Sequence, residues 1–170
     1  AKYFKKAAIR GNNTAMFMYG QMLYYGISIP KNKNKGIKYI KMAADNGNDE
    51  AMYLYAQSLI RENGILIDKK KFIYYIKKSA DLGCEDAIFL YSTFLEKGTG
   101  IPVNKKEASK NYKTLADKGN DLAMLYYARM LRDGDGVPKD TKQAAKYLKM
   151  YADKGNVEGM LFYASFLLDI

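Results

Sequence analysis

One phrase of this sequence returns at multiples of 36 residues along the chain. The stretch AADNGNDEAMYLYAQSL at 43–59 reappears as LADKGNDLAMLYYARML at 115–131 and as YADKGNVEGMLFYASFL at 151–167. Three columns keep the 36-residue spacing with no insertion or deletion: Gly11, Gly47, Gly83, Gly119 and Gly155; Ala8, Ala44, Ala80, Ala116 and Ala152; and Tyr19, Tyr55, Tyr91, Tyr127 and Tyr163. Strict periodicity of this length indicates a repeat array, in which each repeat buries its apolar face against its neighbours.

Each repeat contains the pattern of two amphipathic helices. In the first helix, Ala51, Tyr55 and Leu59 form a stripe at i, i+4 and i+8, which is typical of one buried helix face. The second helix carries its stripe over 40–44. A small residue beside the first stripe lets a neighbouring helix approach closely; this slot holds Gly20, Ala56, Ser92, Ala128 and Ala164.

Residues with capping preferences mark the helix ends. Asn48 precedes the first helix as an N-cap, and Asp49 and Glu50 place negative charge at the positive end of the helix dipole. Gly47 ends the preceding second helix, where a left-handed backbone is needed. Cys84 replaces the capping asparagine in one repeat, whereas the other repeats have Asn12, Asn120 and Asn156.

The turn between the two helices of a repeat is rich in glycine. It reads GTGIPVNKKEA at 98–108 and GDGVPKDTKQA at 134–144, with Asn104 or Asp140 as the cap of the following helix. Neither turn follows a predicted strand or contains the P-loop pattern, so these glycines indicate turns and not a phosphate site. The corresponding stretch at 61–72, RENGILIDKKKF, lacks the first glycine and the proline, and we expect its shape to differ.

The combined pattern resembles a known family. The elements A-x-x-x-[YL]-[GA]-x-x-[LY], G-x-G-[IV]-P, A-x-x-Y and A-A-x-x-G are similar to those of Sel-1-like repeats, a branch of the tetratricopeptide-type α-solenoids. The similarity covers essentially the whole chain and is weakest at Ser28, Glu62, Leu66 and Phe72. The resemblance implies an all-α, right-handed α-α superhelix. It also implies a non-enzymatic protein-binding scaffold, often the adaptor part of a larger signalling, secretory or quality-control protein.

The repeat boundaries follow from the period. We expect one array over 1–170: a second helix at 1–11, full repeats at 12–47, 48–83, 84–119 and 120–155, and a first helix at 156–170. Phe166, Leu167, Leu168 and Ile170 leave apolar surface that no later repeat covers, whereas a complete array normally ends in a polar capping repeat. We therefore expect a fragment of a longer protein. A structural segment that associates end to end with other copies stays open as an alternative.

The composition excludes several kinds of chemistry. The chain has no histidine, which removes the commonest general base and the commonest zinc ligand. A single cysteine, Cys84, excludes an internal disulfide and favours a reducing, cytoplasmic compartment. No apolar run approaches the roughly 20 residues of a membrane span. Methionines at one repeat position are expected to fill the core and not to bind copper; these are Met16, Met52, Met124 and Met160. We therefore expect no enzyme, cofactor or metal site in this segment.

A column of lysines runs along the second helices, and the net charge of the chain is +10. The column consists of Lys5, Lys41, Lys77, Lys113 and Lys149. Such a ladder could follow a phosphate backbone, so binding of nucleic acid or an acidic surface remains the alternative function. Aspartates four residues later offset the last four lysines; these are Asp45, Asp81, Asp117 and Asp153. A solvated outer face is the favoured interpretation, and nucleic acid is not the expected partner.

The face of the first helix opposite the buried stripe is the candidate binding surface, because solenoids usually bind on their concave side. At positions 53, 57 and 61 this face carries large apolar groups beside amide, hydroxyl and guanidinium groups, which suit an extended peptide of a partner protein. Gln21, Gln57 and Arg129 are expected to set its register. The aromatic side chains could instead only pack against the adjoining repeat. The predicted protein-binding residues are Phe17, Gln21, Tyr53, Gln57, Phe89, Thr93, Tyr126 and Arg129.

Overall fold

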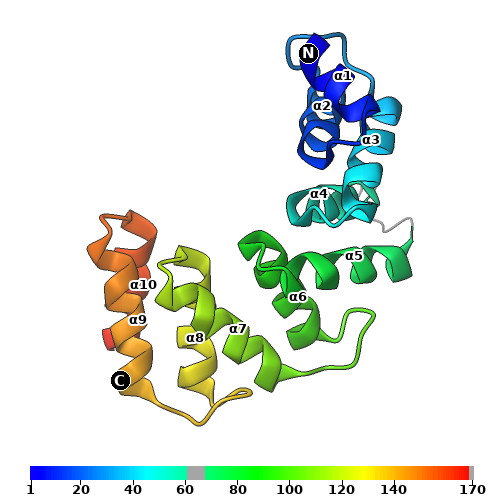
Figure 1. Cartoon of the computed structure of the whole chain (residues 1–170). Coiled ribbons are helices and arrows are strands. Elements are labelled where there is room, and N and C mark those ends of the chain that lie inside the picture. Colours follow the sequence, from blue (N-terminus) through cyan, green and yellow to red (C-terminus); the bar gives the residue numbers. More distant parts are fainter. Residues whose placement is uncertain (61–67, 169–170) are drawn as a thin grey trace. The chain divides into compact units, whose positions relative to one another are not determined.

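The computed structural model describes residues 1–60 and 68–168 (Figure 1). In these ranges the chain is all-α, as predicted, and its helices are α1 (Lys2–Ile9), α2 (Asn13–Tyr25), α3 (Lys33–Asp45), α4 (Asp49–Ser58), α5 (Lys69–Asp81), α6 (Glu85–Lys97), α7 (Lys105–Asp117), α8 (Asp121–Asp133), α9 (Thr141–Asp153) and α10 (Val157–Leu168). Even-numbered helices are the predicted first helices of the repeats, and odd-numbered helices are the second. The turn expected to differ in shape falls mostly on 61–67 and lies outside the described residues, as does Arg61.

The chain divides into two compact units, which are described separately. Unit 1 is Ala1–Ile88 and unit 2 is Phe89–Ile170. In unit 1 each helix from α1 to α5 packs on the next one along the chain, and in unit 2 the same holds from α7 to α10. Sequential packing of this kind is what a repeat array predicts.

The repeat columns form the core of each unit. The alanine column of the first helices is buried at Ala15, Ala51, Ala87 and Ala123, each at most 4% exposed. Ala56 and Ala128 in the small slot are also buried, so that the second helix can pack closely against this face. Met16, Met52 and Met124 fill the core as expected. Met160 does not: it is 48% exposed, because no described helix follows α10 to cover it.

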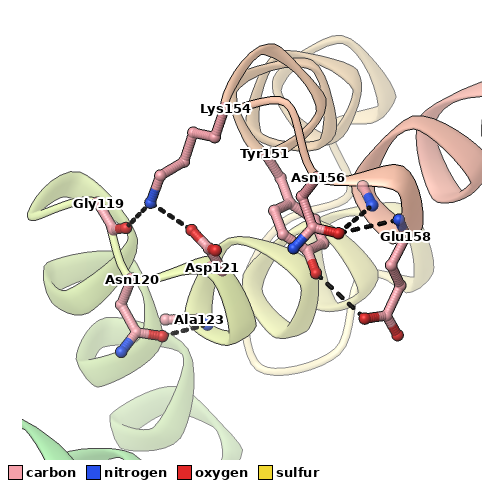
Figure 2. Close-up of polar contacts among 9 residues, drawn as sticks. Gly119, Asn120, Asp121, Ala123, Tyr151, Lys154, Asn156 and Glu158 are labelled. Atoms are coloured by element: carbon pink, nitrogen blue, oxygen red, sulfur yellow. Dashed lines mark hydrogen bonds and ion pairs between the residues drawn. The ribbon is translucent and has the colours of Figure 1, made fainter.

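The predicted N-caps are confirmed. The side-chain oxygen of Asn48 accepts a 2.6 Å hydrogen bond from the backbone N–H of Ala51, and Asn12 and Asn120 cap α2 and α8 in the same way. Asn156 accepts from the backbone N–H groups of Glu158 and Gly159 at the start of α10 (Figure 2). The second helices α7 and α9 are capped by the side chains of Asn104 and Asp140.

The glycine-rich turns use backbone that other residues rarely adopt. Gly136 has a φ of 74°, and a Cβ atom there would lie 2.3 Å from the carbonyl oxygen of Lys105. Ser28 occupies the position equivalent to Gly100 and Gly136 in an earlier repeat. It has a φ of 59° although it carries a side chain. Position 28 is where the family pattern was weakest in this part of the chain, and the structure shows that the left-handed turn is kept there without glycine.

Candidate functional site

The first helices of unit 1 line a hollow of about 580 Å³, called here the unit 1 hollow. Phe17 and Gln21 come from α2, and Tyr53 and Gln57 come from α4. Residues 17, 21, 53 and 57 occupy two columns spaced by 36 positions, so stacking of the two repeats places them at one surface. Four of the eight predicted binding residues therefore meet at a single recess.

These four side chains differ in what they offer to a ligand. Phe17 is 5% exposed, so most of its ring packs within the unit. Tyr53 is half-buried, and its hydroxyl lies near the side chain of Gln57, which is exposed. Burial raises the pKa of the Tyr53 phenol, and the nearby carboxylate of Asp86 raises it further. Tyr53, Gln57 and Gln21 thus provide the accessible polar groups, while Phe17 provides mainly packing.

Carboxylates complete the lining of the unit 1 hollow. Asp49 and Glu50 lie in the first turn of α4, and Glu85 and Asp86 lie in the first turn of α6. From the sequence, the α4 pair was assigned only a role at the helix dipole. The first turns of α4 and α6 face the same recess. Carboxylates that interact favourably with the helix dipoles therefore also line the hollow.

The other four predicted residues lie in unit 2, where three of them form a cluster. The ring centroids of Phe89 and Tyr126 are 5.2 Å apart with their planes at 78°, and the guanidinium of Arg129 lies 4.8 Å from the centroid of Tyr126. The hydroxyl of Thr93 donates a 2.8 Å hydrogen bond to the backbone oxygen of Leu90 in its own helix. Edge-to-face rings and a cation over a ring are favourable contacts without any ligand, as the packing alternative anticipated.

Glu96 holds this cluster in place and was not anticipated. Its carboxylate forms an ion pair with Arg129 and accepts a 3.2 Å hydrogen bond from the hydroxyl of Tyr112. Burial raises the pKa of Tyr112, and the charge of Glu96 adds to the effect. The Glu96 side chain is only 12% exposed, so it positions the guanidinium and does not itself face a partner.

A second hollow, of about 340 Å³, lies among α8, α9 and α10 and is called here the unit 2 hollow. Its lining is mainly apolar and includes Leu125, Leu148 and Phe166, together with the guanidinium groups of Arg129 and Arg132. Tyr126 and Arg129 therefore lie where a ligand could contact them, whereas Phe89 and Thr93 do not line it.

The lysine column of the second helices is offset by carboxylates, as predicted. The ion pairs are Lys41–Asp45 at 2.5 Å, Lys77–Asp81 at 3.1 Å, Lys113–Asp117 at 2.6 Å and Lys149–Asp153 at 2.7 Å. All eight side chains are substantially exposed, so each ion pair contributes about 1 kcal/mol or less to the stability of the fold. The pairing nevertheless lowers the net charge that this face would present to a phosphate backbone.

Comparison with known proteins identifies the family. The sequence profile described as Sel1 repeat matches residues 1–12, 13–48, 49–84, 85–120 and 121–156. The chain belongs to the Sel1 repeat family. Sel1 repeat proteins are generally protein-interaction scaffolds and are typically non-enzymatic. No curated protein matches the sequence.

Solved structures show the same fold. A protective antigen of uropathogenic Escherichia coli with an SLR fold superposes with a TM-score of 0.86 at 22% identity, covering 96% of this chain and 35% of its own length. A Sel1 repeat protein from Oxalobacter formigenes gives a TM-score of 0.78 at 25% identity, covering 95% and 64%. Helicobacter pylori cysteine-rich protein B gives 0.58 at 19% identity, covering 77% and 97%. This Sel1 repeat chain thus spans about a third of the first structure and under two thirds of the second.

Two further findings bear on chemistry at these surfaces. Within residues 1–60 and 68–168, no three acidic or cysteine side chains lie close enough together to hold a metal ion. Over the same residues, no helix has both the length and the apolar character needed to cross a membrane.

Proposed function

We propose that this Sel1 repeat chain is a scaffold that binds an extended segment of a partner protein on the exposed faces of its first helices. The observation that carries the proposal is the unit 1 hollow, which Gln21, Tyr53 and Gln57 line together with the largely buried Phe17. The proposal follows the general role of the family and assigns it to a surface of this chain.

The chemistry of the hollow suits a peptide. The amides of Gln21 and Gln57 can each donate to a backbone carbonyl and accept from a backbone N–H, which any peptide segment offers. Tyr53 adds apolar ring surface with a polar end, the combination enriched at protein interfaces. Each hydrogen bond of this kind contributes about 0.5–1.5 kcal/mol, so affinity requires several contacts along the array.

Unit 2 supplies a second contact region. Arg129 is held by Glu96 and stacked on Tyr126, so its guanidinium is ordered before any ligand arrives. An ordered side chain loses less conformational entropy on binding than a mobile one. This supports the expectation that Arg129 helps to set the register of the bound segment.

The test is a selection from a displayed library of random 12-residue peptides on the immobilised chain. We expect recovered peptides to bind the native chain and to lose about tenfold in affinity with the Gln57→Ala and Tyr53→Ala double variant, because two contacts are removed. The matched control is the double variant Asn34→Ala and Met42→Ala on α3, two exposed uncharged positions in the same unit, which should bind normally. Recovery of no binding peptide, or equal affinity of the two double variants, contradicts the proposed function.

A further inference from the structure

The unit 1 hollow is negatively charged in a strongly basic part of the chain. Residues 1–88 contain nearly twice as many lysines and arginines as acidic residues. Four carboxylates nevertheless line the hollow, and none of its lining residues is a lysine or arginine; the carboxylates are Asp49, Glu50, Glu85 and Asp86. The charge of the hollow is thus opposite to that of its surroundings.

A comparison of equivalent positions shows how one of these charges is left unneutralised. In unit 2, Lys154 reaches back to the preceding repeat, where its ammonium group contacts the carboxylate of Asp121 and, at 2.6 Å, the backbone oxygen of Gly119 (Figure 2). Position 49 is equivalent to 121, and position 82 is equivalent to 154. Leu82 occupies that position in unit 1, and its uncharged aliphatic side chain cannot pair with Asp49.

The carboxylates of Glu50 and Asp86 resemble that of Asp49 in this respect. Among the residues that the structure describes, Asp49, Glu50 and Asp86 form no ion pair with a lysine or arginine. The carboxylates also do not converge into a metal site within the described ranges. They are spread around a recess with aromatic walls, which suits an elongated cation more than a single metal ion.

We propose that the unit 1 hollow receives an arginine or lysine side chain of the partner segment; this inference rests on the proposed function. The carboxylates of Asp49, Glu50 and Asp86 complement its charge, and the rings of Tyr25 and Tyr53 offer surface for its apolar stem or guanidinium plane. Gln21 and Gln57 remain for the backbone of the segment. Electrostatic complementarity of this kind selects the partner and speeds association.

The peptide selection also tests this inference through the sequences that it recovers. We expect arginine and lysine to be enriched over the unselected library, although the net charge of the chain, +10, repels cationic peptides in general. Nonspecific attraction to this chain would enrich acidic peptides instead. Recovery of binding peptides that are neutral or acidic leaves the proposed function standing and overturns the inference, whereas recovery of none overturns both.

Variants of equal charge locate the effect. The triple variant Asp49→Asn, Glu50→Gln and Asp86→Asn should bind a recovered cationic peptide with about tenfold lower affinity, because three charge contacts are lost. The control triple variant Asp81→Asn, Asp133→Asn and Asp153→Asn changes the net charge equally at exposed sites elsewhere and should change affinity less than twofold. Equal effects of the two triple variants overturn the inference.

A measurement on the native chain does not depend on how the variants fold. Titration of the ¹⁵N-labelled chain with the same cationic peptide should shift the backbone amide signals of Asp49, Glu50 and Asp86 and the side-chain amide signal of Gln57. Shifts confined to other parts of the chain place the peptide elsewhere and overturn the inference.

Discussion

The hydroxyl of Tyr147 in α9 donates a 2.6 Å hydrogen bond to the carboxylate of Asp117, at the end of α7 in the preceding repeat. The other oxygen of Asp117 accepts a 2.6 Å hydrogen bond from Lys113. Unit 1 contains the same arrangement, in which Tyr75 and Lys41 donate to Asp45. The aspartate therefore does more than offset a lysine, because it also ties α3 to α5 in unit 1 and α7 to α9 in unit 2.

Replacing Tyr147 with Phe should lower the free energy of unfolding by about 1 kcal/mol, since one half-buried hydrogen bond between repeats is lost while the ring stays in place. Urea unfolding followed by circular dichroism measures the change. The control is Tyr74→Phe, whose ring is 56% exposed and whose hydroxyl has no hydrogen-bond partner among the described residues. A loss as large in Tyr74→Phe as in Tyr147→Phe contradicts a specific role for the hydrogen bond.

The same carboxylate makes stability depend on acid pH. Hydrogen bonds from Lys113, and then from Tyr147, hold the pKa of Asp117 below its ordinary value of 3.8. Because the folded-state pKa is lowered, the stabilisation is complete above the unfolded-state pKa and is lost as pH falls through the folded-state pKa. At pH 7 the native chain should therefore have a higher free energy of unfolding than Asp117→Asn. This gap between the two free energies should narrow below about pH 4. Urea titrations at pH 7, 4, 3 and 2 measure it, and a constant gap down to pH 2 would show that the charge is not responsible.

The glycines of one turn should differ in their tolerance of a side chain. Gly134 and Gly136 both have positive φ, at 72° and 74°. A Cβ atom at 136 would lie 2.3 Å from the backbone oxygen of Lys105, whereas at 134 the nearest atom is 3.4 Å away. Gly134→Ala should cost about 1–2 kcal/mol from backbone strain, and Gly136→Ala distinctly more, because backbone must also move. Thermal unfolding of the two variants compares them, and equal melting temperatures would contradict the close contact.

A glycine in place of Ser28 should stabilise the turn of the first repeat. Ser28 has a φ of 59°, a region in which a non-glycine residue costs about 1–2 kcal/mol. Ser28→Gly should raise the free energy of unfolding by about 0.5–1 kcal/mol, since relief of strain exceeds the added entropy of the unfolded chain. Urea unfolding measures the gain. Ser165→Gly, within α10, should change stability in the opposite direction, and a loss of stability in both variants would contradict strain at Ser28.

The repeat and its caps could be predicted because they depend on residues that are close in sequence. Asn48 and the N–H that it caps are three positions apart, and the aspartate column lies one helical turn after the lysines. Contacts between repeats were harder to predict. That Tyr147 binds Asp117 depends on how successive second helices stack, and the sequence alone does not state that stacking.

At the candidate site, too, features within one helix could be predicted from the sequence, whereas features that depend on neighbouring repeats could not. Position along the helix predicted that Phe17, Tyr53 and Gln57 share a face, and they do line one hollow. Their exposure depends on neighbouring repeats, which leave Gln57 exposed and cover Phe17. The negative charge of the hollow was not predicted, because it arises where the first turns of α4 and α6 face the same recess.

Position 82 gives a direct way to change the charge of the unit 1 hollow, because the equivalent residues of the next two repeats are Lys118 and Lys154. In Leu82→Lys the new ammonium group should pair with Asp49, as Lys154 pairs with Asp121. Leu82 is 56% exposed, so the change empties no core position and stability should stay within about 0.5 kcal/mol. Affinity for a cationic peptide from the selection should fall about threefold to tenfold, because one complementary charge is neutralised and another cation is added.

The matched control for this variant is Leu122→Lys on α8, at a leucine that is 50% exposed and lines neither hollow. It adds the same charge to the chain, so any effect of net charge alone appears equally in both variants. Fluorescence anisotropy of the labelled peptide at low and moderate salt compares them. If Leu122→Lys weakens binding as much as Leu82→Lys, long-range repulsion explains the loss and Asp49 has no local role. A loss confined to Leu82→Lys places the cation of the peptide beside Asp49.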